Sequence, residues 1–323
     1  EMACAHDGDI ALAKKIIDGA GKASSDIIQL QIWSLKYMMV TSRDDYQPLK
    51  KIEFSFGEWS ELVSYSREKY PDMKVYVCVY EHKSIENILK LNIDGFKINS
   101  SDLSNPLVLK KIAEAKKPVN LSVGASTINE INEALKLIRK YNNSEITLMY
   151  GFQSFPTKHE NVNLNFLKTL YDKYKLPLGY QDHCDGNSQS GFWLPALAIG
   201  LGANVIEKHI THDRNFKGFD HESALNIDEF FEFSRMLNIL DASRGTEKER
   251  SFSKEELEYR KFQKKTVLSS ENLVKGKIIM EDDLVFMRAD KIGLQPNEIK
   301  LLLNKKLNKD IERHSLITLE DIE

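Results

Sequence analysis

Short apolar runs alternate with amphipathic stretches over residues 1–243. The runs are too short for helices and end in polar clusters, which predicts buried parallel strands. The amphipathic stretches predict the crossover helices that parallel strands need, and Asp9 and Thr127 are expected to cap two of them. Counting a shortened first strand, eight strand-helix units predict a closed (β/α)8 barrel, or TIM barrel. The expected strands are residues 1–4, 26–33, 74–80, 94–97, 118–124, 146–156, 176–180 and 203–206.

Two features depart from this regular alternation. The sequence opens at Glu1 in what reads as the end of a strand. Because a strand normally has four or more residues, we expect part of the first strand to lie upstream. Residues 34–53 are polar with scattered aromatic side chains, and we expect a long loop there, a candidate substrate lid.

Two histidines follow neighbouring predicted strands. His183 comes after the run at 176–180 and His209 after the run at 203–206, 26 residues later. One strand-helix repeat has about this length, so both side chains should lie at the same rim of a barrel, on strands roughly 5 Å apart. A single histidine at a strand end is more often an ordinary polar residue. Two at equivalent positions favour a divalent metal site with open positions for substrate.

Composition excludes several classes of protein. The 45 basic and 48 acidic residues are finely interspersed and give a formal charge of −3, so nucleic acid and anionic membranes are poor candidate partners. No apolar run approaches the ~20 residues of a membrane span, and no signal peptide is visible. Three widely spaced cysteines argue for a reducing compartment. We therefore expect a cytoplasmic protein.

The pattern changes after the last predicted barrel helix. Residues 244–265 are strongly charged and predict a linker with helical ends. Residues 266–323 contain short β-rich runs and turn signals, which predicts a separate small β-rich domain. A domain of this size is expected to be stabilised by contact with a partner surface.

Five segments resemble the sialic acid synthase family, which includes legionaminic and pseudaminic acid synthases. They occur in the family's order and span nearly the whole chain. The segments are EMACAHDGDIALAKKIIDGA, GFKINSSDL, GYQDHCDG, VIEKHITHDRNFKGFDHESAL and LSSENLVKGKIIMEDDLVFMRADKIG. The resemblance implies a TIM barrel followed by a domain similar to type III antifreeze protein. It also implies a metal-dependent condensation of phosphoenolpyruvate with an N-acylated hexosamine, giving a nonulosonic acid and phosphate.

The resemblance assigns roles to several residues. His183 and His209 would bind the divalent metal, usually manganese, with magnesium or cobalt as alternatives. Lys97 and Ser100 match the phosphoenolpyruvate-binding residues of the motif K-I-G-S, which is KINS here. The metal would polarise the sugar aldehyde while C3 of phosphoenolpyruvate attacks it.

Three further residues carry catalytic and partner roles in this resemblance. Glu1 matches an acidic residue near the reacting carbons, and Asp220 matches an acid that contacts the sugar. Arg288 matches an arginine of the tail domain that reaches the neighbouring subunit's site, which implies a domain-swapped homodimer.

The chain also departs from the family pattern. In the motif K-F-Q-T, Gln31 keeps the glutamine but Gln29 replaces the lysine, and the motif S-T-P-F becomes VCVY, with Cys78 in place of a hydroxyl residue. Three substrate-facing positions are also changed, and they are Gln153, Phe155 and Gln181. Lys158, on the loop after Phe155, is the lysine that we expect to compensate for Gln29, with a solvated loop lysine as the alternative.

These departures leave two other functions open. One is a metal-dependent aldolase or other carbonyl enzyme of the same fold that does not use phosphoenolpyruvate. The other is a non-catalytic sugar-binding or regulatory paralogue. His6, His212 and His221 lie near the predicted site in the sequence, and the pattern does not assign them as ligands.

Overall fold

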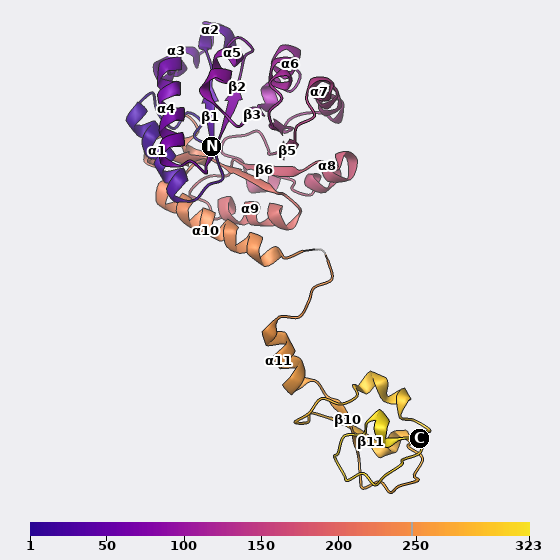
Figure 1. Ribbon diagram of the computed structural model, residues 1–323. Helices are drawn as coiled ribbons and strands as arrows, with labels where there is room; N and C mark the ends of the chain where they lie inside the picture. The colour runs from indigo at the N-terminus through magenta and orange to yellow at the C-terminus, as the bar shows by residue number, and fades with distance from the viewer. Residues whose placement is uncertain (247) are drawn as a thin grey trace. The chain divides into compact units, whose positions relative to one another are not determined.

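The computed structural model describes residues 1–246 and 248–323 and divides into two compact units, Glu1–Gly245 and Thr246–Glu323. In the first unit, seven parallel strands each pair with the next strand along the chain. Helices lie around the outside of this sheet (Figure 1). The strands are β1 (Ile27–Ile32), β2 (Lys74–Val79), β3 (Gly95–Ile98), β4 (Val119–Ser122), β5 (Ile146–Tyr150), β6 (Leu178–Asp182) and β7 (Val205–Lys208). The predicted parallel α/β architecture is therefore confirmed.

The connections follow the predicted alternation. Asp9 caps the first helix by accepting hydrogen bonds from the backbone of Ala11 and Leu12, and Thr127 forms a capping box with Glu130, as predicted. The helices are α1 (Ile10–Lys22), α2 (Leu35–Met38), α3 (Tyr46–Ile52), α4 (Phe56–Lys69), α5 (Ile85–Ile88), α6 (Pro106–Glu114), α7 (Ile128–Tyr141), α8 (Phe166–Tyr174), α9 (Ser190–Gly200) and α10 (Ile227–Arg244). A short parallel pair, β8 (Ile210–Thr211) and β9 (Leu225–Asn226), precedes α10.

The start of the chain lies between the two outer strands. The Met2 amide donates to the Gln29 carbonyl of β1 at 3.0 Å, and the Glu1 amino group donates to the Lys208 carbonyl of β7 at 3.0 Å. The expected strand at residues 1–4 is wrong, because Ala3 adopts a positive φ of 46° and turns the chain away. Two residues are too few for a regular ladder, but their backbone groups still bond to both outer strands.

The expected long loop at residues 34–53 is also wrong, since this segment contains α2 and α3. Its apolar residues Leu35 and Leu49 pack with Trp33 and Cys4 in a small buried cluster beside the main core. The helices are short and widely spaced, so their apolar positions showed no clear period in the sequence. Tertiary burial fixes them here.

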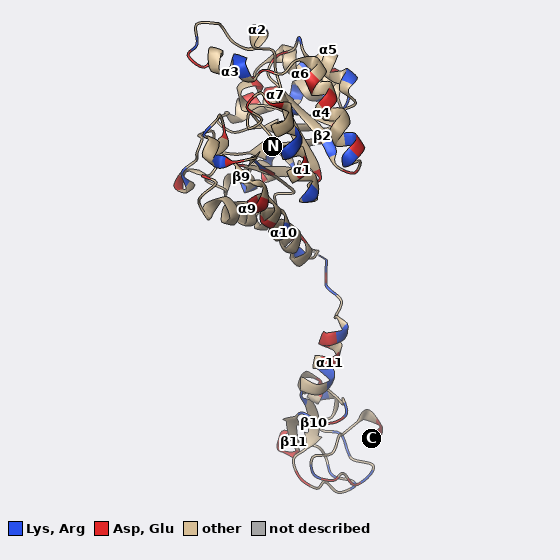
Figure 2. Cartoon of the chain, turned by 90° about the vertical axis from the view of Figure 1, so that its left-hand side faces the viewer, with Lys and Arg blue, Asp and Glu red and all other residues tan. Residues whose placement is uncertain are grey.

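The strands are buried on both faces, as expected when helices cover a parallel sheet. Acidic and basic residues occur side by side on the outer helices of the first unit (Figure 2). Among the described residues, no helix is long and apolar enough to cross a membrane. The cysteines Cys4, Cys78 and Cys184 are all buried and free.

The second unit has its own core. It begins with α11 (Lys254–Gln263), and its strands β10 (Thr266–Ser269) and β11 (Leu284–Met287) form an antiparallel pair. Short 3-10 helices and single β-bridges complete it. The buried residues of its core are Val267, Leu273, Ile279, Leu302, Leu307, Ile311 and Ile317.

Candidate active site and metal centre

The register of β6 and β7 brings two histidines together. Gln181 lies opposite Glu207, and the pairing continues to the ends of both strands. His183 and His209 each follow directly, so they occupy equivalent positions at the carboxyl ends of neighbouring strands. Their ring centroids are 5.5 Å apart.

These imidazoles and one carboxylate are arranged to bind a metal ion. One ligand atom from each of His183, Glu207 and His209 lies within 4.8 Å of the other two. His183 Nδ1 lies 2.9 Å from the Phe152 carbonyl oxygen. That oxygen can only accept, so Nδ1 carries the proton and Nε2 keeps its lone pair for a metal.

The protonation state of the histidines also suits a metal. Burial lowers the pKa of His183, and burial, together with the nearby positive charge of Lys97, lowers the pKa of His209 well below its ordinary value. Both rings are therefore neutral near pH 7, the form in which imidazole binds metals. Within the described residues His209 Nδ1 is buried without a hydrogen-bond partner, which is the environment expected beside an additional ligand. These residues fit a divalent ion.

A buried lysine lies next to this group. Lys97 on β3 forms a very short ion pair with Glu207 and lies 3.5 Å from the carboxylate of Glu1. Burial alone would lower the pKa of Lys97, but Glu207 and Glu1 raise it overall, so the amine is charged. Burial raises the pKa of Glu1, and Lys97 only partly opposes this effect. The charged amine of Lys97 and the Glu1 carboxyl group, whose pKa is raised, therefore lie next to each other in the buried interior.

Hydroxyl and amide groups continue from this position across the sheet. Gln181 Nε2 donates to Glu207 Oε1 at 3.0 Å, and Gln181 Oε1 accepts from the Ser122 hydroxyl at 2.5 Å. The Ser122 and Ser100 hydroxyl oxygens are 3.0 Å apart. A continuous series of hydrogen bonds thus links the Lys97 amine, through the side chains of Glu207, Gln181 and Ser122, to the Ser100 hydroxyl. The amine and hydroxyls of this series are groups suited to binding an anion.

Other predicted substrate residues lie on the segment after β5 and on β1. The Phe155 ring is half exposed and its centroid is 4.4 Å from that of His183. Gln153 is partly buried, and its amide donates to the Gly151 carbonyl at 3.4 Å. Gln31 is buried on β1 and accepts a 2.7 Å hydrogen bond from the Tyr80 hydroxyl.

The other three predicted residues lie on separate segments of the chain. Asp220 immediately precedes the 3-10 helix His221–Ser223 that follows β8; burial raises its pKa, and contacts with Cys4 partly oppose the shift. Lys158 is exposed on the loop after β5. Arg288 is exposed just after β11 in the second unit.

A cavity of about 490 Å³ opens between β1 and β7. Gln29, Glu1 and Glu207 contribute to its wall, with residues of α10 on the other side, but neither His183 nor His209 lines it. Gln29 Nε2 is buried and has no hydrogen-bond partner among the described residues. Gln29, which stands where the family has a lysine, therefore faces this interior cavity and not the space beside His183 and His209.

The sequence placed Glu207 at the rim of the two histidines but did not assign it as a metal ligand, and it did not single out Ser122. Glu207 lies on β7 two residues before His209, which directly follows the strand, and extended backbone with this spacing directs both side chains to the same face. This spacing was the available signal for a third ligand. Ser122 gave no such signal, because one serine in an apolar strand is common and its partner Gln181 is distant in the sequence.

The model of the NeuB family matches residues 16–249. This chain belongs to the NeuB family. The resemblance inferred from the sequence motifs is thereby confirmed, and the matched range contains His183, His209 and Lys97. Known NeuB relatives are similar over almost the full length of the chain.

The sequence relatives include proteins of known activity. N,N'-diacetyllegionaminic acid synthase of Legionella pneumophila is 26% identical over 341 residues, covering 98% of this chain and 92% of that protein. MJ1065, an uncharacterized protein of Methanocaldococcus jannaschii, is 32% identical over 320 residues, covering 98% of this chain and 91% of that protein. The crystal structure of an N-acetylneuraminic acid synthetase from Leptospira borgpetersenii is 28% identical, with a TM-score of 0.73 over 80% of this chain and 88% of that one.

Proposed function

We propose that this NeuB-family chain condenses phosphoenolpyruvate with an N-acylated hexosamine of the N-acetylmannosamine type, giving a nonulosonic acid and phosphate. The observation that carries the proposal is the neutral histidine pair beside a buried, charged lysine. Such a pair suits a metal that acts on a carbonyl group, and the lysine suits an anionic donor. The synthase names of the relatives from Legionella and Leptospira agree with this reaction class.

The metal would be held by His183 and His209, and the Glu207 carboxylate lies close enough to be a third ligand. Mn²⁺ is the expected ion, and Mg²⁺ or Co²⁺ are alternatives. When bound, the ion supplies Lewis-acid polarisation of the sugar aldehyde.

The side chains of this chain would hold the two substrates in place. Lys97 and Ser100 bind the anionic groups of phosphoenolpyruvate, Glu1 lies against the reacting carbons, and Asp220 binds the sugar. C3 of phosphoenolpyruvate forms a bond with the aldehyde carbon, water adds to C2, and the C2–O bond breaks to release phosphate. Phe155, Gln153, Gln181 and Gln31 would line the substrate.

We also propose the architecture that this reaction requires. The first unit would form a closed barrel of the (β/α)8 type, in which residues 1–2 bridge β1 and β7 in place of the predicted first strand. The second unit would be an antifreeze-like domain, and two chains would form a domain-swapped homodimer in which Arg288 of the partner subunit completes each site. Phosphoenolpyruvate as donor and three buried free thiols agree with a cytoplasmic location.

Gln29 favours a second candidate function. Its neutral amide stands where a cation was expected from the family pattern, so a same-fold aldolase that uses another donor is the alternative. A non-catalytic sugar-binding protein is a third possibility.

The experiment that separates these functions is a phosphate-release assay with phosphoenolpyruvate, Mn²⁺ and a panel of N-acyl hexosamines. The proposed synthase releases phosphate only when an accepted sugar is present. Either alternative gives no sugar-dependent phosphate.

Lys158→Ala should raise the Michaelis constant for phosphoenolpyruvate by roughly tenfold or more without changing metal binding, if Lys158 supplies the charge that Gln29 lacks. Gln29→Lys added to this variant should recover part of the loss. The control is Lys168→Ala, which removes an exposed lysine of α8. It should change neither the Michaelis constant for phosphoenolpyruvate nor metal binding. If Gln29→Lys alone tightens donor binding and Lys158→Ala does nothing, Lys158 has no such role.

Arg288→Ala should abolish most activity, and mixing that chain with a His183→Ala chain should restore part of it. In the swapped dimer, one of the two sites then has both an intact metal centre and an intact arginine. The activity of purified heterodimers is the measurement. Arg313→Ala, an exposed arginine of the same unit, should retain full activity, and a verified heterodimer without activity would argue against swapping.

A further inference from the structure

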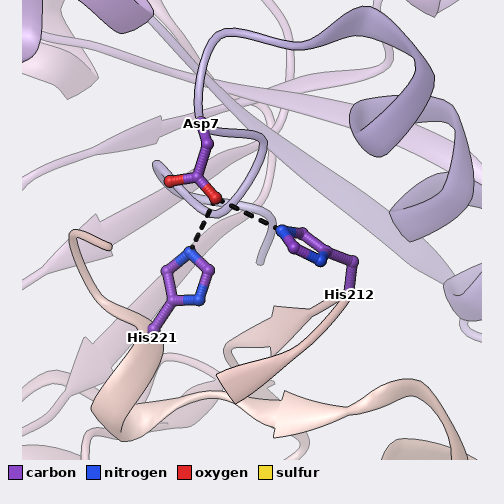
Figure 3. A group of neighbouring side chains, drawn as sticks. All are labelled: Asp7, His212 and His221. Carbon is purple, nitrogen blue, oxygen red and sulfur yellow. Dashed lines mark hydrogen bonds and ion pairs between the residues drawn. The ribbon is translucent and has the colours of Figure 1, made fainter. Parts of the chain in front are cut away.

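A second group of side chains, separate from His183, Glu207 and His209, has ligand atoms close enough together to hold a metal ion. Asp7 comes from the turn before α1, His212 directly follows β8, and His221 begins the next 3-10 helix. Figure 3 shows the three side chains pointing toward one another. Asp7 Oδ2 lies 3.2 Å from His212 Nε2 and 3.2 Å from His221 Nε2.

His221 directs a buried ring nitrogen into this group. The ring is fully buried, and its Nδ1 lies 3.1 Å from both the Asp213 carbonyl oxygen and the Thr211 hydroxyl. Its Nε2 faces the Asp7 carboxylate and makes no hydrogen bond among the described residues. A cation bound between Nε2 and the carboxylate would be a partner for both groups.

The spacing of the atoms fits such a cation. Ligands bound to zinc at ~2.0–2.1 Å in a tetrahedron are roughly 3.3 Å apart, close to both measured contacts. A Cβ at Gly218 would lie 2.4 Å from Asp7 Oδ1 and 2.9 Å from His221 Nε2. The glycine therefore leaves free the space beside the ligands that any side chain would fill.

We propose that Asp7, His212 and His221 bind a second divalent cation of the zinc type. Two imidazole nitrogens and one carboxylate oxygen are a ligand set that zinc accepts, with a fourth position for water. The ion joins the turn before α1 to the loop that carries Asp220, which directly precedes His221 in the chain. Its role is to position Asp220, and the site is independent of the donor and sugar proposed above.

The test measures Zn²⁺ binding to the full chain after removal of all metals, with no substrate present. His183→Ala and His209→Ala are combined first, so that the proposed site is counted alone. This double variant should retain one Zn²⁺ per chain by calorimetry and by metal analysis after gel filtration. Adding Asp7→Asn, which keeps the side-chain volume, or His212→Gln should weaken Zn²⁺ binding strongly. The loss should exceed the ~10–100-fold that is typical when a residue hydrogen-bonded to a metal ligand is replaced.

His159→Ala, at an exposed histidine, is the matched control and should leave the Zn²⁺ in place. Circular dichroism confirms that each variant is folded, and Co²⁺ in place of Zn²⁺ gives a visible spectrum that should change with Asp7→Asn but not with His159→Ala. A folded double variant that binds no Zn²⁺ would overturn the proposal. So would undiminished binding in both the Asp7→Asn and His212→Gln variants.

Discussion

Replacing His183 or His209 with alanine should remove one bound Mn²⁺ per chain and lower turnover by about a thousandfold. The two imidazoles are the neutral ligands of the proposed centre. Lewis-acid stabilisation of several kcal/mol corresponds to a rate factor of this size. Both histidines lie beyond the strand ends but are buried, so their truncation should lower the free energy of unfolding by about 0.5–3 kcal/mol. Metal analysis and turnover of the folded variants are the measurements.

The control for this prediction is His159→Ala, which removes an exposed imidazole from a loop. It should leave both metal content and turnover unchanged. Unaltered Mn²⁺ content in both the His183→Ala and His209→Ala variants would show that the metal is bound elsewhere.

Lys97→Met should destabilise the fold by about 3–5 kcal/mol and weaken phosphoenolpyruvate binding by roughly tenfold to a thousandfold. The substitution leaves the carboxylates of Glu1 and Glu207 buried without their cation, which accounts for the lost stability. The lost affinity reflects the missing charge beside a dianionic ligand, about 2–4 kcal/mol. Denaturant titration and donor binding to the folded variant measure the two effects separately.

Lys208→Met provides a matched control. Lys208 is also fully buried and lies 2.5 Å from Asp182, but alternation along β7 directs it away from Glu207, toward the helices. The variant should lose a similar amount of stability while binding phosphoenolpyruvate normally. Equal losses of donor affinity in both variants would mean that Lys97 acts only through stability.

The sequence predicted the fold because its signal was local. Short apolar runs and capped amphipathic helices recur often enough to identify parallel strands and crossovers. The spacing between His183 and His209 equals that between the paired residues Gln181 and Glu207. The register of the two strands therefore places the two histidines side by side.

The remaining features depend on contacts between distant segments. The helices α2 and α3 are fixed by the burial of Leu35 and Leu49, which no local period reveals. The bonds that join Ser122 to Gln181 and Lys97 to Glu207 cross the sheet between segments 59 and 110 residues apart. Asp7 and His212, separated by 205 residues, are likewise brought together only by the complete fold.

The most direct test of the proposed reaction follows the oxygen that joins C2 of phosphoenolpyruvate to phosphorus. This oxygen is labelled with oxygen-18, and the full chain is incubated with the labelled donor, Mn²⁺ and an accepted N-acyl hexosamine. Because the C2–O bond breaks in the proposed mechanism, we expect the label in inorganic phosphate, formed only when the sugar is present and in equal amount to a product with a new C–C bond. Phosphate without the label, or labelled phosphate released equally without sugar, would contradict the proposed function.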